Sequence, residues 1–103
     1  MHLSITHLAT FLAVVQYGSM TAAAMALTYS LSTVSAHVTH LERQLRIRLL
    51  RRGTEGCEPT AAGREVADRA AELLTLHDDI VVSAAGADRV RRDANDPMPV
   101  GVA

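Results

Sequence analysis

The sequence predicts a mainly α-helical domain with one small β-hairpin and a long final helix. Two observations support this prediction. Apolar residues recur three and four residues apart through most of the first half of the chain, a spacing that is typical of amphipathic helices. Between residues 46 and 60 this spacing gives way to two short β-compatible runs around a glycine-containing tip. The 103 residues leave room for one domain.

The first two predicted helices are short and follow each other closely. The first is expected over residues 4–17, and Gly18 ends it. Ser19 then caps a second helix that is rich in alanine, so another helix can approach it closely. The apolar positions of the first helix fall at i, i+3, i+4 and i+7, and they are Leu8, Phe11, Leu12 and Val15.

The third predicted helix follows after a short connection. Ser30 is its expected N-cap, and the helix runs to about Leu45. Two helices joined in this way have the layout of a helix-turn-helix, whose second helix enters the major groove of DNA. A plain helical hairpin has the same spacing, so the spacing alone leaves both interpretations open.

The outer face of this third helix is unusual in composition. It carries Ser, Thr and His, whereas a solvated helix usually prefers Glu and Lys. Small hydroxyl side chains would let the helix lie deep in a groove, and they can contact phosphate or either kind of base. The opposite, buried stripe is expected to consist of Leu31, Val34, Val38 and Leu41.

The charge of the chain is unevenly distributed. A net charge of −1 argues weakly against binding to nucleic acid. However, the arginines of the first half all lie within residues 43–52, and a local cluster of arginine is consistent with phosphate contact. The cluster consists of Arg43, Arg46, Arg48, Arg51 and Arg52.

The second half is expected to form a two-stranded hairpin, or wing, and then a long helix over residues 61–85 that Thr60 caps. So small a domain cannot bury the whole apolar stripe of such a helix, so a second copy of the chain is expected to cover the surplus. Residues 86–103, rich in Gly, Asp, Asn and Pro, are interpreted as a linker. The stripe comprises Val66, Ala70, Leu73, Leu74, His77, Ile80 and Val81.

Several classes of function are not indicated. Without a Gly-rich phosphate loop, a Ser/His/Asp set or paired buried carboxylates, the sequence predicts neither an enzyme nor a cofactor. It shows no apolar run of membrane-spanning length, and the single Cys57, interpreted as an inert thiol, suits a reducing cytoplasm. No metal site is expected because ligand spacing is lacking around the five histidines, His2, His7, His37, His40 and His77.

One series of residues has a spacing along the chain that is hard to obtain by chance. They are Leu8, Phe11, Gly18, Ser19, Ala22, Ala23, Leu27, Ser30, Ser35, Leu41, Glu42, Leu45, Leu49, Arg52, Thr60 and Gly63. Through them, residues 3–63 resemble, without a gap, the DNA-binding domain of LysR-type transcriptional regulators. The resemblance continues more loosely along the helix that follows.

The resemblance implies a winged helix-turn-helix of three helices and a two-stranded wing over residues 1–60. It also implies that residues 61–85 form a linker helix that pairs in a homodimer, with higher oligomers possible in a full-length protein. Residues 86–103 would be a hinge and the start of an effector domain, because the final MPVGVA resembles the first strand of that domain. The chain is therefore expected to be truncated, and a small-molecule effector is expected only with the missing domain.

The resemblance further implies which residues contact DNA. His37 is expected on the exposed arc of the third helix, and His40 is expected to be a surface residue without that role. Arg43 and Arg48 are secondary candidates for phosphate contact. The expected DNA-binding residues are Ser30, Leu31, Ser32, Thr33, Ser35, His37, Arg51 and Arg52.

Three residues depart from the family pattern. Leu31 stands where the family usually has Gln, and Leu can offer only an apolar contact, for example to a thymine methyl group. Arg46 stands where Gly is common, at a position expected to be left-handed at the end of the helix. Leu50 replaces a usual Phe. None of these changes is expected to break the fold.

The sequence therefore predicts a dimeric, sequence-specific DNA-binding transcription regulator. Each subunit would place residues 31–45 in the major groove of one half of an inverted repeat in double-stranded DNA. The alternative is a winged-helix module that dimerises and binds proteins but not DNA. The weak overall charge and Leu31 favour this alternative slightly, whereas the arginine cluster and the match through Ser30, Ser35 and Arg52 favour DNA.

Overall fold

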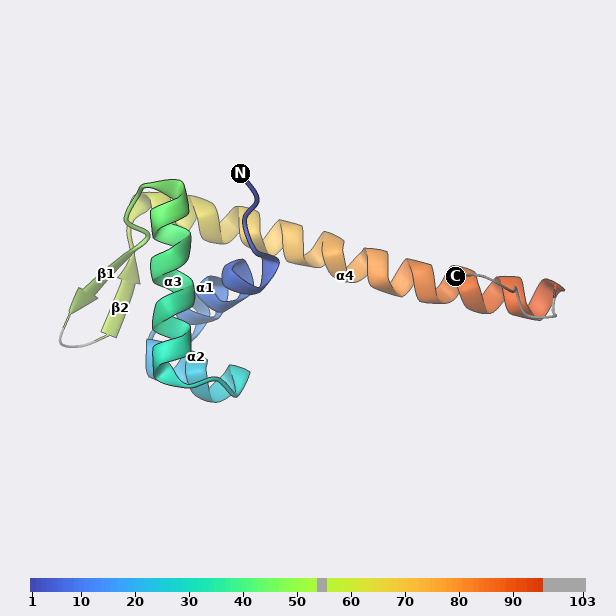
Figure 1. The fold of residues 1–103 in the computed structure, drawn as a ribbon, viewed down its shortest axis with the longest axis horizontal. Helices are drawn as coiled ribbons and strands as arrows, with labels where there is room; N and C mark the ends of the chain where they lie inside the picture. Colours follow the sequence, from blue (N-terminus) through green and yellow to red (C-terminus); the bar gives the residue numbers. More distant parts are fainter. Residues whose placement is uncertain (54–55, 96–103) are drawn as a thin grey trace.

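The computed structural model describes residues 1–53 and 56–95. Three helices, the first turns of a fourth and one antiparallel pair of strands form a head, from which the rest of the fourth helix projects far to one side (Figure 1). The elements are α1 (Ile5–Tyr17), α2 (Met20–Leu27), α3 (Leu31–Leu45), β1 (Leu50–Gly53), β2 (Gly56–Pro59) and α4 (Ala61–Asn95).

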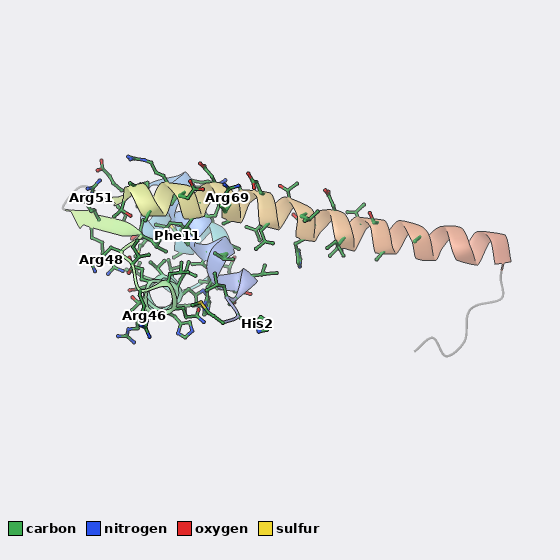
Figure 2. The ribbon with its side chains drawn as sticks, turned by 90° about the horizontal axis from the view of Figure 1, so that it is seen from above. His2, Phe11, Arg46, Arg48, Arg51 and Arg69 are labelled. Atoms are coloured by element: carbon green, nitrogen blue, oxygen red, sulfur yellow. The ribbon has the colours of Figure 1, made fainter. Side chains whose placement is uncertain are left out.

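The core lies where α1 meets α2, α3 and the first turns of α4. Phe11 is fully buried at its centre, as the periodicity of α1 predicts (Figure 2). Small residues let the other helices approach: Ala23 and Ala24 are buried on α2, and Ala67 and Ala70 on α4. The head is therefore packed from aliphatic side chains with a single aromatic ring at its centre.

The helix ends follow the hydroxyl residues that the sequence indicates. The hydroxyl oxygens of Ser19 and Ser30 accept hydrogen bonds from the N–H groups of Ala22 (2.9 Å) and Thr33 (3.1 Å). Gly18 ends α1 in the left-handed conformation, with φ 78°. Both predicted N-caps are confirmed, and the connection between α2 and α3 is a tight turn.

The wing is fastened to the head at both of its ends. The Glu42 carboxylate accepts hydrogen bonds from the N–H groups of Leu49 (2.8 Å) and Leu50 (3.3 Å), which ties the start of β1 to α3. The Thr60 hydroxyl donates to the Arg48 carbonyl (2.7 Å) and accepts from the Gly63 N–H (2.9 Å). These bonds fix the wing beside the C-terminal end of α3, where α4 also begins (Figure 1).

The last helix is longer than the sequence predicts. The expected end at Ala85 is wrong, because α4 continues through Gly86 to Asn95. A single glycine inside a helix costs only about 1 kcal/mol, and no proline follows before Pro97. Of the predicted linker, residues 86–95 are thus helical, and residues 96–103, with the MPVGVA segment, lie outside the described part of the chain.

Candidate nucleic-acid interface

Helix α3 turns one stripe towards the core and the opposite arc to solvent. Val34, Val38 and Leu41 are 0% exposed. On the opposite side, side chains at spacings of four, four and three residues are exposed, which places them along one line of the helix. We call this line the outer arc; it consists of Ser32, Ala36, His40 and Arg43.

Leu31 does not belong to the buried stripe, so that part of the prediction is wrong. Its side chain is 52% exposed. Helical side chains lean towards the N-terminus, so a side chain at the first position of a helix points past the end of the helix. Periodicity alone assigns Leu31 to the stripe, but no preceding turn of α3 is present to cover it.

The hydroxyl groups around the start of α3 bond to one another. Besides capping the helix, the Ser30 hydroxyl donates to Thr33 Oγ1 (2.9 Å) and lies 3.1 Å from Ser32 Oγ. Ser30 and Ser32 remain exposed, while Thr33 and Ser35 are half-buried beside them. The predicted hydroxyl residues are thus together at a helix N-terminus, where backbone N–H groups and the helix dipole favour an anion such as phosphate.

His37 is half-buried against α1, so it lies at the edge of the exposed arc and not in the middle of it. Its Nδ1 atom lies 2.9 Å from the buried Thr10 hydroxyl. That hydroxyl donates its single proton to the Thr6 carbonyl (2.9 Å), so it must accept from His37, and Nδ1 carries a hydrogen. His37 follows Val34 by three residues and precedes Leu41 by four, a spacing that indicates the edge of the buried stripe.

His37 is one of three histidines that gather between α1 and α3. The ring of His7 lies 4.6 Å from that of His37 and 5.0 Å from that of His40, and Tyr29 meets His37 edge-on at 5.4 Å. Burial lowers the pKa of His7, and positive charge on His37 or His40 would lower it further. The cluster therefore favours the neutral form of His7.

The predicted arginine cluster follows one end of the head. Arg51 and Arg52 are exposed on β1, Arg43 is exposed on the last turn of α3, and Arg46 and Arg48 are exposed between α3 and β1. Figure 2 shows Arg46, Arg48 and Arg51 along the end of the head that is remote from the far end of α4. In the described part of the chain, the salt bridges of arginine belong to Arg69, and none involves this cluster.

Arg51 and Arg52 also border a hollow between the wing and the end of α1. This hollow has a volume of about 510 Å³, and Gly18, Cys57 and Glu58 are among its other lining residues. Cys57 lies opposite Arg52 in the register of the two strands, and its N–H donates to the Gly18 carbonyl at 3.4 Å. The two arginines therefore stand on a wing that is anchored directly to α1.

The predicted stripe on α4 divides into two parts. Ala70 is buried against the head, and Val66 and Leu74 are half-buried. Leu73 is exposed, and so are the stripe residues beyond Leu74. Leu76 and Val82, which the predicted stripe leaves out, are also large and exposed. The exposed stripe of α4 comprises Leu73, Leu76, His77, Ile80 and Val81, whereas Val82 lies on the opposite side of the helix.

The described residues show neither a candidate metal site nor a candidate membrane-spanning helix. Among residues 1–53 and 56–95, no group of three or more His, Cys, Asp or Glu side chains could hold a metal ion, even though three histidines are neighbours. In the same ranges, no helix combines the length and the apolar character needed to cross a membrane.

Comparison with known proteins gives a consistent result. A family model described as bacterial regulatory helix-turn-helix protein, lysR family, matches residues 5–64. The probable HTH-type transcriptional regulator LrrA of Synechococcus elongatus is 43% identical over 79 residues, which are 77% of this chain and 27% of that protein. The HTH-type transcriptional regulator YofA of Bacillus subtilis is 38% identical over 91 residues, 88% of this chain and 30% of that protein.

The chain therefore spans less than a third of the length of these two relatives. Among solved structures, the complex of the BenM DNA-binding domain with benA site 1 DNA matches with a TM-score of 0.77 at 32% identity. The match covers 82% of this chain and 98% of that chain. The predicted fold class, a winged helix-turn-helix followed by a long helix, is confirmed.

Proposed function

The chain belongs to the lysR family of bacterial regulatory helix-turn-helix proteins, and from this we propose that it binds double-stranded DNA sequence-specifically and regulates transcription. Its similarity to a domain solved on DNA supports this proposal. The alternative of a module that binds proteins but not DNA has no support among these relatives. We propose a regulator in the cytoplasm and not an enzyme.

The observation that carries the proposal is the position of α3 in the head. Its outer arc is exposed along the whole helix, and its N-terminus adds hydroxyl and N–H groups that suit phosphate. We propose that α3 enters the major groove with this surface. His37 is included, because its ring is only half-buried against α1 and only its Nδ1 atom bonds to Thr10. The proposed contacts on α3 are Ser30, Leu31, Ser32, Thr33, Ser35 and His37.

The arginines of the wing supply the charge that α3 lacks over most of its length. Arg51 and Arg52 are exposed and free of salt bridges within the described residues, so their charge is available to DNA phosphates. Phosphate contacts supply most of the affinity for DNA, whereas base contacts supply the choice of sequence. The proposal therefore assigns affinity to the wing and specificity to α3.

We further propose that α4 pairs with α4 of a second copy. Its exposed apolar stripe supports this, because soluble proteins rarely leave so long an apolar face uncovered. A dimer of this kind would bind an inverted repeat whose half-site distance the paired helices set. Residues 1–60 would then form the DNA-binding part and residues 61–85 the dimerisation part. A small-molecule effector is proposed only for a protein that also has the effector domain.

The test is selection of duplexes from a random-sequence pool, followed by footprinting of the enriched sequence. We expect an inverted repeat, protected in two major-groove segments on one side of the duplex. Enrichment of unrelated sequences, with uniform protection, would contradict sequence-specific binding. A variant with Arg51→Ala and Arg52→Ala should bind the selected duplex and unrelated duplexes more weakly in equal proportion.

A further inference from the structure

We propose that the N-terminal half of α3 recognises thymine through its 5-methyl group, with Leu31 as the contacting side chain. This inference rests on the proposed function, because it needs α3 in the major groove. In that groove thymine is the one base that presents a methyl group, and the other features are hydrogen-bond donors and acceptors. The inference follows from which side chains of α3 are free to read a base.

Every residue of α3 that could form paired hydrogen bonds with a base lies in its C-terminal part, and two of the three are engaged. The Glu42 carboxylate accepts from the N–H groups at the start of β1. The Gln44 amide donates to the His2 carbonyl (3.2 Å), and its Oε1 atom is buried. Arg43 is exposed, but twelve residues separate it from Leu31, or about 18 Å along the helix.

The polar groups of the first two turns discriminate poorly between bases. Ser30, Ser32 and Thr33 bond to one another, and serine or threonine hydroxyls accept or donate to any base. The imidazole of His37 is half-buried and one of its two nitrogens bonds to the Thr10 hydroxyl, so it cannot form paired hydrogen bonds with a base. No amide, carboxylate or guanidinium group therefore faces outwards from residues 31–37.

Apolar contact remains as the means of discrimination in these turns. Leu31 is 52% exposed at the N-terminal end of the helix, the end that meets base edges in helix-turn-helix proteins. Ala36, on the outer arc, is exposed and too short to hold the helix away from the base edges. Burying one methyl group in an apolar contact changes affinity by about fourfold, which suffices to prefer thymine at a contacted position.

The experiment compares two forms of one duplex. A duplex is selected from a random-sequence pool with the 103-residue chain and is then remade with deoxyuridine in place of thymidine, which removes only the methyl groups. We expect the affinity to fall about fourfold for each methyl group that Leu31 buries. Equal affinity for both forms would overturn the inference and leave DNA binding intact.

Two variants assign the effect to Leu31. In Leu31→Ala, the ratio of the two affinities should fall towards one, since the methyl group loses its partner; an unchanged ratio would overturn the assignment. Val82→Ala, which shortens an exposed aliphatic side chain on α4, should keep the wild-type ratio. Leu31→Gln should move the selected base towards adenine, which pairs with an amide. Failure to enrich or bind any duplex would instead remove the proposed function itself.

Discussion

Arg46 ends α3 in the left-handed conformation, with φ 59° and ψ 39°. An L-residue in this conformation costs about 1 to 2 kcal/mol because its Cβ atom crowds the backbone, and glycine avoids that cost. The left-handed conformation was expected at this position, because glycine is the usual residue there in the family that the sequence resembles. The side chain of Arg46 is exposed, so the cost belongs to the backbone and not to its packing.

We predict that Arg46→Gly raises the free energy of unfolding by about 1 kcal/mol in urea denaturation. Arg46→Ala is the matched control, because it removes the same charge but keeps the Cβ atom. If both variants had the same stability, backbone strain at Arg46 would not be the cause.

His7 makes the stability of the head depend on pH. Its pKa in the folded protein lies below the ordinary value of 6.5, through burial and through the charges of His37 and His40. The unfolded chain therefore binds more protons, so stability is complete above pH 6.5 and is lost as the pH falls below that value. No carboxylate on α1 opposes this effect, because α1 has none, and Glu42 of α3 bonds to β1.

We predict that His7→Gln loses less stability between pH 7 and pH 5.5 than the wild type does. The reason is that the variant has no imidazole at this position to take up a proton on unfolding. Thermal unfolding at the two pH values measures the difference. His2→Gln, a change at an exposed histidine before α1, should retain the wild-type loss; equal losses in all three proteins would exclude His7.

The single residues show what a sequence can and cannot predict. The caps at Ser19, Ser30 and Thr60 are local, because each hydroxyl bonds to an N–H group three residues ahead. The position of His37 depends on Thr10, which lies 27 residues away on another helix, and no local pattern indicates that bond. Side chains at the edge of a helical stripe are therefore the uncertain part of a predicted site.

At the scale of an element, two glycines of α4 have opposite roles. A Cβ atom added at Gly63 would collide with the Leu49 carbonyl oxygen, so α4 can pass the start of β1 only with glycine there. A Cβ atom at Gly86 would meet nothing within 4 Å. The same residue type is thus a packing requirement at one position and a weak point of the helix at the other.

We predict that Gly63→Ala destabilises the fold by at least about 2 kcal/mol, because the backbone of β1 or α4 must move. Gly86→Ala should instead stabilise α4 by about 1 kcal/mol, since alanine is the better helix former. Urea denaturation followed by circular dichroism measures both changes. A Gly63→Ala protein as stable as the wild type would contradict the close packing described here.

Element boundaries show where the sequence was least informative. The starts of α2, α3 and α4 were predictable because each has a capping hydroxyl residue before it. The end of α4 was not predictable in this way, because a glycine such as Gly86 is also typical of a helix end. A helix ends where the residues that follow no longer favour the helical conformation. The cost of one glycine is small, and the good helix formers around Gly86 offset it.

At the scale of the whole molecule, the exposed stripe of α4 has no partner within the described chain. Ile80 and Val81 are 63% and 56% exposed. We predict that Ile80→Asp converts a dimer to a monomer in sedimentation equilibrium, because a charge would be buried in an apolar interface. Asp78→Asn, a neighbouring change without added charge, should leave the dimer intact. A wild-type chain that is monomeric at high micromolar concentration would refute the proposed pairing.

The distribution of charge over the whole molecule explains why a small net charge is compatible with binding to DNA. The net charge of −1 describes a chain in which five arginines lie within residues 43–52, at one end of the head, whereas most acidic residues lie along α4 together with the other five arginines. The sequence showed this separation, but it could not show that the wing lies beside the C-terminal end of α3, where Glu42 bonds to it (Figure 1). A partner therefore meets a positive surface at the head, although the chain as a whole is slightly negative.

The central claim is that this head binds double-stranded DNA through phosphate contacts from the wing. The most direct measurement is the affinity for random-sequence duplex DNA at two salt concentrations. The affinity should fall steeply as salt rises, and Arg52→Ala should lower the slope of log affinity against log salt by about one. If the chain did not bind duplex DNA even at low salt, the claim would be refuted and a protein-binding module would be the better account.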